Sequence, residues 1–260
     1  VPLASFLAWA VSWRAAFAIA AAAALITFSA IRITVPKVPA LPDSGFAAQF
    51  RFLRSLEPWL VLGAIGLGNG GFFAYYSYVN PVMEHVAAVP ASMMSVVITL
   101  AGAGMVLGNL FCAKISSSFS DESLAAAGQG VLLLSLASVF FLAHWSPAAI
   151  ALTTLAAGCV FFISGPEQVL MIRNAKEGQL LAASLAQVSF NAGNAVGAWL
   201  GGLPIDAGKA ANWAAMPGFF LALAGFGLLF ANWLIHRVRE EERTAGRIAA
   251  LQDQIQSKMP

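Results

Sequence analysis

Apolar and polar positions between residues 57 and 81 follow the pattern of a membrane span with one polar face. About 20 residues in a row carry no charge, enough to cross a hydrocarbon core of about 30 Å at about 1.5 Å per residue. At about 100° per residue, one face of the predicted helix collects amides and aromatic rings, namely Asn69, Phe72, Phe73, Tyr76 and Asn80. Polar groups are costly in hydrocarbon, so this face is predicted to look into a helix bundle or a wet cavity.

The same pattern recurs along the chain and predicts seven complete spans, at 15–33, 58–80, 92–113, 124–143, 147–172, 180–203 and 213–235. Residues 1–11 predict a further, incomplete span. They lack an initiator Met and a basic segment, so we expect no cleavable signal peptide and a chain that is part of a longer protein. Between and after the spans, residues 34–57 form a polar connector and residues 236–260 form a charged tail, predicted to be a solvated helix or a frayed end.

Composition favours a membrane bundle over a soluble domain. Hydrophobic residues make up 59% of the chain and charged residues 10%, against about 25% charged residues in a soluble domain. Mean hydropathy is +0.77. We therefore predict an all-α, polytopic transmembrane helical bundle. The two cysteines, Cys112 and Cys159, lie inside apolar runs and are interpreted as ordinary packing residues.

The positions of the basic residues predict the orientation in the membrane. When the loops are assigned to alternate sides, one side receives 12 of the 14 basic residues: Arg32, Lys37, Arg51, Arg54, Lys114, Arg173, Lys176, Arg237, Arg239, Arg243, Arg247 and Lys258. The other side receives Arg14 and Lys209. The positive-inside rule makes the first side cytoplasmic, so the connector and the C-terminal tail are predicted to be cytoplasmic. Within the connector, residues 46–56 are expected to form a short amphipathic helix on the membrane surface.

Polar residues form stripes in three other predicted spans. In 180–203 the stripe consists of Ser184, Gln187, Asn191 and Asn194, and in 92–113 it consists of Ser95, Thr99 and Asn109. In 147–172 it consists of Ser164, Glu167 and Gln168. Pro166, within this last stripe, is expected to kink its helix. Glycines spaced for close helix packing occur beside the polar faces: Gly66, Gly70, Gly104, Gly108, Gly193, Gly197 and Gly201.

Two interpretations of the stripes stay open. The amides can join helices, each hydrogen bond contributing about 1 kcal/mol or less. They can also line a cavity at the membrane midplane that binds a small polar solute, and three stripes with glycine seams favour this reading. The substrate-binding residues are then expected to be Asn69, Phe73, Tyr76, Asn80, Gln168, Gln187, Asn191 and Asn194.

Glu167 is the most informative single residue of the stripes. Acids inside a membrane are rare and mark proton or cation pathways, so Glu167 is a candidate for proton coupling. The alternative is a structural ion pair with Arg173, which lies six residues, or about 9 Å, further along the same predicted helix.

Other motifs do not support a catalytic or metal site. Residues 66–71 fit G-x-G-x-x-G but lie inside an apolar run with no strand before a helix, which argues against a dinucleotide site. His85, His144 and His236 are far apart, and the chain has no Walker sequence and no nucleophile motif. We therefore predict that the protein is not an enzyme and has no cofactor and no metal. Acids interrupt the basic tail, so no nucleic-acid partner is expected either.

Four segments carry a resemblance to a known family: residues 68–81, 104–110, 168–176 and 190–202, the last reading FNAGNAVGAWLGG. Through them, residues 1–235 resemble spans five to twelve of a major facilitator superfamily transporter, and more closely the AraJ-like branch of the drug:proton antiporter group. The resemblance implies two six-helix halves, a midplane substrate site, alternating access, and cytoplasmic termini in the bacterial inner membrane. It also implies an order of regions: 1–33 end the N-terminal half, 34–57 form the central loop, 58–235 form the C-terminal half, and four further spans precede the chain.

The chain departs from this family at two motifs. After residue 113, Lys114 stands at the usual basic position, but serines stand at 117 and 118, where Asp and Arg are common. The glycine-proline motif of the fifth span is reduced to Pro2. The leading hypothesis is proton-coupled efflux of a small sugar or drug-like solute. The alternative is a polytopic membrane protein with a structural or sensing role and no transport.

Overall fold

The computed structural model describes residues 12–34, 46–175 and 178–256, and every regular element in these ranges is helical. Five described stretches are long and apolar enough to cross a membrane, by length and composition alone: Phe17–Thr34, Ala91–Ile115, Asp121–Leu142, Ser146–Arg173 and Ala211–Arg239. The prediction of an all-α polytopic transmembrane bundle is confirmed. The incomplete span predicted at residues 1–11 lies outside the described residues.

The helices follow the predicted spans. In chain order they are α2 (Trp13–Thr34), α3 (Phe46–Gln49), η1 (Arg51–Arg54), α4 (Glu57–Tyr76), α5 (Val79–Pro81), η2 (Val82–Val86), η3 (Ala91–Met93), α6 (Met94–Ile115), α7 (Asp121–Leu142), α8 (Ser146–Asn174), α9 (Gln179–Asp206), η4 (Ala211–Ala214) and α10 (Ala215–Gln256). The last of these continues from its membrane part into the predicted tail as one helix of 42 residues.

One predicted boundary is wrong. The span expected over residues 58–80 ends as α4 at Tyr76, and a turn separates it from α5. The reason is Pro81, whose ring has no N–H to donate and clashes with the carbonyl group four residues earlier, at Ser77. The chain then continues as η2, a π-helix, before it turns back.

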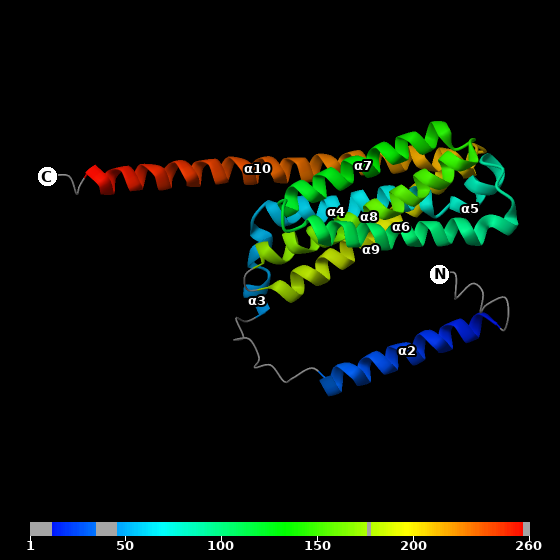
Figure 1. The fold of residues 1–260 in the computed structure, drawn as a ribbon, viewed down its shortest axis with the longest axis horizontal. Coiled ribbons are helices and arrows are strands. Elements are labelled where there is room, and N and C mark those ends of the chain that lie inside the picture. The colour runs from blue at the N-terminus through cyan, green and yellow to red at the C-terminus, as the bar shows by residue number, and fades with distance from the viewer. Residues whose placement is uncertain (1–11, 35–45, 176–177, 257–260) are drawn as a thin grey trace.

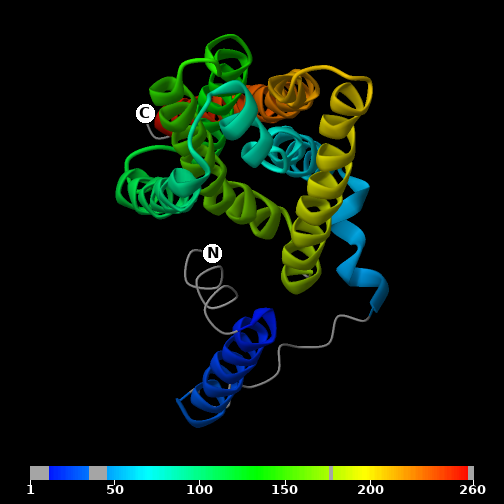
Figure 2. The same ribbon diagram turned by 90° about the vertical axis from the view of Figure 1, so that its right-hand side faces the viewer.

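Helix α4 is the central helix of the bundle and packs against α8, α9 and α10. Figures 1 and 2 show α6, α7, α8, α9 and α10 gathered with α4, whereas α2 is drawn apart from them. The apolar stretch of α2, Phe17–Thr34, has no buried residue in the described part of the structure. Its apolar surface is therefore available to lipid or to further helices.

Glycines bring α4 and α9 together backbone to backbone. A Cβ atom on three α9 glycines would overlap a carbonyl group of α4, in the pairs Gly193–Gly66, Gly197–Gly70 and Gly201–Ala74. The pairs advance by four residues on both helices, so α4 and α9 run side by side in the same direction. Lipid tails are as apolar as leucine, so dispersion contact at such close approach holds the two helices together.

Small residues recur along α4 and α9, where the two helices meet. With 20 and 28 residues, both are long enough to cross a membrane, although neither is among the five apolar stretches. Glycine, amide and hydroxyl groups take the place of large apolar side chains along them. Helices α6 and α8 also meet at small residues, with Gly104 against Thr154 and Gly108 against Gly158.

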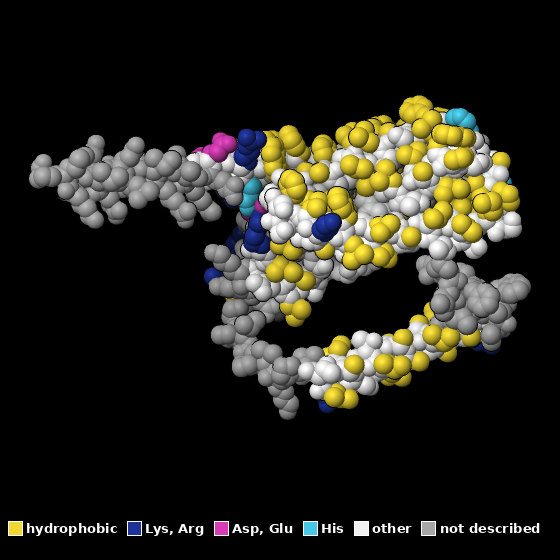
Figure 3. Space-filling view, in the orientation of Figure 1, with side chains coloured by type: hydrophobic (Ala, Val, Ile, Leu, Met, Phe, Trp, Pro, Cys, Tyr) yellow, Lys and Arg dark blue, Asp and Glu magenta, His cyan; other side chains and the backbone are white. Residues whose placement is uncertain are grey.

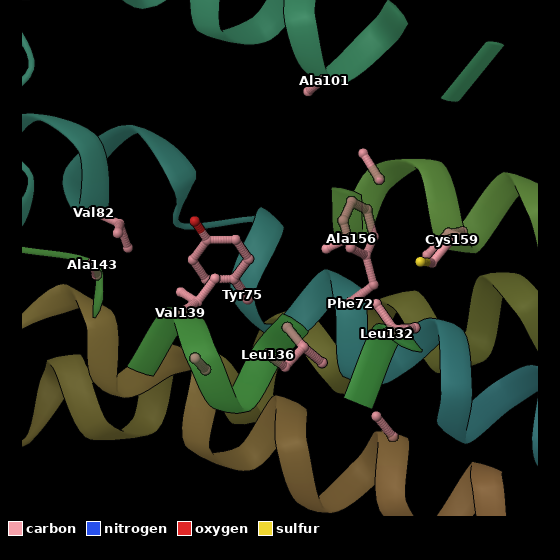
Figure 4. Close-up of a cluster of buried hydrophobic side chains, with 14 of the residues drawn as sticks. Phe72, Tyr75, Val82, Ala101, Leu132, Leu136, Val139, Ala143, Ala156 and Cys159 are labelled. Atoms are coloured by element: carbon pink, nitrogen blue, oxygen red, sulfur yellow. The ribbon is translucent and has the colours of Figure 1, made fainter. Parts of the chain in front are cut away.

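The largest group of buried apolar side chains fills the space between α4, α6, α7, α8 and α10 (Figure 4). Phe72 and Tyr75 of α4 lie in it with Leu132 and Leu136 of α7, and none of the four has exposed surface. Because these side chains come from helices far apart in sequence, the cluster can form only when α4 occupies the centre of the bundle.

Charged side chains gather at the end of the bundle where α4 and α7 begin and α8 ends, which we call the charged end (Figure 3). Arg173 donates a hydrogen bond to Glu122, and Arg239 donates one to Glu57. Both carboxylates are buried, and His236 lies 3.7 Å from each of them. These contacts join α4, α7, α8 and α10 at one end.

Helix-end chemistry builds part of this cluster. The Ser120 hydroxyl caps α7 by accepting a hydrogen bond from the Ser123 amide at 3.3 Å. Asp121 and Glu122 follow in the first turn, where negative side chains interact favourably with the helix dipole. Arg173 lies in the last turn of α8, where a positive side chain is favoured for the same reason.

The Gly197→Ala substitution is expected to destabilise the bundle by about 1–3 kcal/mol, because the new methyl group would force α9 away from Gly70. The matched control is Gly102→Ala. A Cβ atom at Gly102 meets no atom within 4 Å, so the higher helix propensity of alanine should keep or raise the stability. Unfolding in mixed micelles measures the free energy of unfolding of both variants. Equal stabilities of the two variants would contradict the close contact of α4 with α9.

Candidate functional site

A cavity of about 310 Å³ lies between α4, α8 and α9. Apolar and polar side chains share its walls: Ile65, Val160, Phe161, Ser164, Glu167, Gln168, Ala186, Gln187 and Phe190. At about 1.5 Å per residue, Glu167 is about 10 Å from the end of α8 and Gln187 about 12 Å from the start of α9. The cavity therefore lies well inside a hydrocarbon layer of about 30 Å.

Glu167 is buried next to Asn69 of α4, and the two side chains are 2% and 1% exposed. Asn69 donates a hydrogen bond through Nδ2 to the Ile65 carbonyl group at 2.8 Å, and its side chain lies beside the Glu167 carboxyl group. Glu167 Oε1 and Asn69 Oδ1 have no partner within the described part of the chain. A buried polar atom without a partner costs about 1–3 kcal/mol, so these oxygens are ready to bind a proton, a water or a solute.

The ion pair considered as an alternative for Glu167 is not formed. Arg173 is paired with Glu122 and lies 4.0 Å from Asp121, both on α7. Its guanidinium group therefore belongs to the charged end, whereas Glu167 lies against α4. The predicted ion pair between Glu167 and Arg173 is wrong, because the Arg173 guanidinium group binds two carboxylates at the start of α7 instead.

The polar stripe of α9 continues the cavity lining along the surface of the bundle. Gln187 and Asn191 are exposed, and Asn191 Nδ2 donates to the Gln187 carbonyl group at 2.9 Å. Asn194 is half-buried, and its Oδ1 atom is buried without a partner among the described residues. On α8, Gln168 is exposed beside the buried Glu167. The amides thus lie on a face that the described helices leave uncovered.

Two aromatic residues of α4 extend the cavity wall. The Phe73 ring lies edge-on to Phe190, with 6.1 Å between the ring centroids, and Phe190 lines the cavity. Tyr76 is half-buried and stacks on Phe72 with a centroid distance of 4.7 Å. Asn69, Phe73 and Tyr76 therefore lie on one face of α4, as predicted.

Asn80 does not continue this face. It lies in α5, beyond the turn that follows α4, and its side chain is exposed. The extrapolation from Asn69 to Asn80 fails because a rotation of about 100° per residue holds only within an unbroken helix.

Two buried polar contacts escaped the sequence reasoning. The Tyr75 hydroxyl and Thr153 Oγ1 are 2.6 Å apart, and Gln129 Nε2 donates to the Ala222 carbonyl group at 3.2 Å. Neither residue belongs to a predicted stripe: Gln129 occurs alone in an apolar run, and Tyr75 lies off the polar face of α4 that carries Asn69 and Tyr76. A Cβ atom at residue 68 would overlap the Gln129 side chain, so the glycine there makes room for Gln129. The sequence alone does not show this, because it does not show that α4 and α7 are neighbours.

The cavity has the chemistry of a solute site. It offers one carboxyl group, two primary amides and apolar walls, the mixture of a few polar groups and much apolar surface that is typical of small-molecule pockets. Within residues 12–34, 46–175 and 178–256, no three His, Cys, Asp or Glu side chains are grouped to hold a metal ion. Such a site can exchange a proton and hydrogen-bond a neutral solute.

Comparison with known proteins identifies the family. No family model matches the sequence. AraJ of Escherichia coli (strain K12) is 34% identical over 229 residues, which cover 88% of this chain and 58% of AraJ. The chain is an AraJ-like member of the major facilitator superfamily. YfhI of Bacillus subtilis (strain 168), named an MFS-type transporter, is 26% identical over 88% of the chain and 57% of YfhI.

A further relative carries a named activity. The purine ribonucleoside efflux pump NepI of Escherichia coli (strain K12) is 27% identical over 210 residues, which cover 79% of this chain and 52% of NepI. The family prediction is thus confirmed, and the AraJ-like chain is a multi-pass bacterial membrane protein. It spans a little more than half the length of these relatives.

The Arg173→Gln substitution is expected to lower the stability by about 1–2 kcal/mol, because Glu122 would stay buried without its partner. The arginine is 45% exposed, so the loss should be smaller than for a fully buried pair. Adding Glu122→Gln should restore part of the loss, since it removes the buried unpaired charge.

A double-mutant cycle followed by thermal unfolding measures this coupling. The control is Glu241→Gln, which breaks an exposed pair with Arg237 and should cost about 0.5 kcal/mol or less. If Arg173→Gln and Glu241→Gln lower the free energy of unfolding by the same amount, the ion pairs of the charged end do not stabilise the bundle.

Proposed function

We propose that this chain is part of a proton-coupled secondary transporter that exports a small solute by alternating access. The observation that carries the proposal is the cavity at which Glu167, Gln168 and Gln187 meet. Membership of a superfamily whose relatives are named transporters and efflux pumps supports it. So does the depth of the cavity, because secondary transporters bind solutes and coupling ions near the midplane.

Glu167 is proposed to carry the coupling proton. Its carboxyl group is buried and lacks a cationic partner within the described chain, so its charged form is costly. Asn69 can serve both forms of the acid, because an amide both donates and accepts hydrogen bonds. Alternating access would open the cavity to one side of the membrane at a time, so the proton would be taken up on one side and released on the other.

The amides are proposed to bind the solute. Gln168 and Gln187 present donors and acceptors at the cavity, and Asn191 and Asn194 continue the row along α9. Phe73, Tyr76 and Phe190 add ring surface for an apolar part of the solute. This combination suits a sugar or a drug-like molecule, and the name of NepI adds purine ribonucleosides to the solutes worth testing.

The proposal assigns a place in the full transporter to each region. Residues 58–235 form the C-terminal six-helix half, 34–57 the central loop, and 1–33 the end of the N-terminal half. Further N-terminal spans of the same protein would face the uncovered amides and close the solute path. The charged end and the tail at 236–260 lie in the cytoplasm, since most basic residues are on that side.

The test is transport by the intact gene product in proteoliposomes with an imposed pH gradient. Candidate solutes are a monosaccharide, a purine ribonucleoside and a drug-like amphiphile. The Glu167→Gln variant should lose accumulation driven by the gradient, because its side chain cannot exchange a proton, while exchange of solute without a gradient persists. Gln187→Ala should raise KM about tenfold, since it removes one or two hydrogen bonds to the solute.

Gln179→Ala is the matched control, because Gln179 is an exposed glutamine of α9 that does not line the cavity. It should transport as the unaltered protein does. If Glu167→Gln accumulates solute normally, Glu167 is not the proton carrier. If the intact protein moves no solute of any class, the alternative of a structural or sensing role without transport is favoured.

A further inference from the structure

His236 of α10 lies between two buried carboxylates at the charged end. Its Nε2 atom is 3.7 Å from Glu57 Oε2 of α4, and its Nδ1 atom is 3.7 Å from Glu122 Oε1 of α7. Glu57 and Glu122 are 8% and 6% exposed, whereas the His236 side chain is 26% exposed. A proton can therefore reach the imidazole ring from solution, although both carboxylates beside the ring are buried.

Two separate ion pairs surround this ring. Arg239 of α10 donates a hydrogen bond to Glu57, which joins α10 to α4. Arg173 of α8 donates one to Glu122, which joins α8 to α7. Among the ionisable side chains that the structure describes at this end, His236 alone contacts both carboxylates. Its ring therefore connects the α4–α10 pair with the α7–α8 pair.

The ring can bind both carboxylates at once only in its protonated form. A neutral imidazole carries hydrogen on one nitrogen, and the lone pair of the other nitrogen would then face a carboxylate oxygen. An imidazolium ring can donate from both nitrogens, and its positive charge attracts both carboxylates. Nε2 is buried and has no hydrogen-bond partner within the described chain. Once it carries a proton, the acceptor within reach is Glu57.

The charges around the ring favour the same form. Within the described chain, the acids of this cluster are Glu57, Asp121 and Glu122, and the guanidinium groups in contact with them are those of Arg173 and Arg239. Three negative groups thus meet two positive ones, and a protonated His236 makes the numbers equal. The exposed pair of Arg237 with Glu241 on α10 adds no net charge. Because uncompensated charge is costly at a buried position, the cluster stabilises a proton on the ring.

We propose that His236 is a proton-binding site that acts as a clasp between the two ion pairs. With the proton bound, the ends of α4, α7, α8 and α10 form one cluster. Without it, the α4–α10 pair and the α7–α8 pair both persist, but the link between them is lost. The clasp shares no residue with the solute cavity, so it is separate from the proton exchange proposed for Glu167. The charged end then loosens as the pH around it rises.

The first measurement is nuclear magnetic resonance of the intact gene product with isotope-labelled histidine in detergent micelles, because the imidazole nitrogen signals differ between the neutral ring and imidazolium. The signal that is missing from His236→Gln belongs to His236. It should keep the imidazolium form to about one pH unit above the signal of His85, which corresponds to about tenfold tighter proton binding. His85 is the matched reference, since it is an exposed histidine of η2. Loss of the His236 proton at the same pH as that of His85, or at a lower pH, would overturn the proposal.

The second measurement is unfolding of the intact gene product in mixed micelles at a series of pH values. A proton held more tightly in the folded chain than in the unfolded chain stabilises the fold below about pH 6.5, and this contribution is lost as the pH rises toward about 8. Relative to His236→Gln, the unaltered protein should therefore show a rise of about tenfold in its unfolding equilibrium constant over this range. His85→Gln should behave as the unaltered protein does.

Two further variants complete the test. His236→Lys keeps a positive charge throughout this pH range, so it should lose the pH dependence and retain the stability of the protonated form. Parallel pH curves for the unaltered protein and His236→Gln would contradict the clasp. If His236→Gln does not fold, Glu122→Gln replaces it. One imidazole signal should then release its proton about tenfold more readily, and the absence of any such change would also contradict the clasp.

Discussion

Direct contact between the backbones of α4 and α9 is the constraint on which the rest of the bundle depends. Glycines at every fourth position remove the side chains that would otherwise separate the two helices. This contact places the amides of α9 beside the buried pair on α4 and α8, so it sets the width of the cavity. Gly66 and Gly193 of the same contact also line a second, mainly apolar groove between α4, α9 and α10. The contact of α4 with α9 thus shapes both the partly polar cavity and the apolar groove.

This arrangement places amides and bare backbone on α4 and α9, two helices that line the cavity together with α8. Alone in a membrane, α4 and α9 would expose amides and much bare backbone to hydrocarbon, which is costly. Together they cover each other's backbone and bury Asn69, whereas Gln187 and Asn191 lie on the face that the described helices leave uncovered. The apolar stretches of α6, α7, α8 and α10 surround or flank them. Assembly of the bundle therefore covers backbone that would be costly to expose to lipid.

Sequence reasoning predicted the spans, their order and the polar residues of the cavity, because apolar length and helical periodicity depend on local sequence. It placed Glu167, Gln168 and Gln187 on polar stripes, and the structure brings these three together. It failed at Asn80, where Pro81 interrupts the helix and with it the periodicity. It also left two roles open for Glu167, proton coupling or an ion pair with Arg173, since the choice depends on which side chains of other helices lie beside each of the two residues. Tyr75 and Gln129 have partners on other helices, so no stripe could reveal them.

Helix α10 has a mechanical consequence that follows from its continuity. Arg239 is held in the bundle by its ion pair with Glu57, and the same helix continues to Gln256, about 26 Å further at about 1.5 Å per residue. No break separates the membrane part from this extension. A tilt of the bundle by about 10° would therefore swing the far end of the helix sideways by about 4–5 Å, as a lever does. A label placed there would magnify rocking movements that are too small to resolve at the cavity itself.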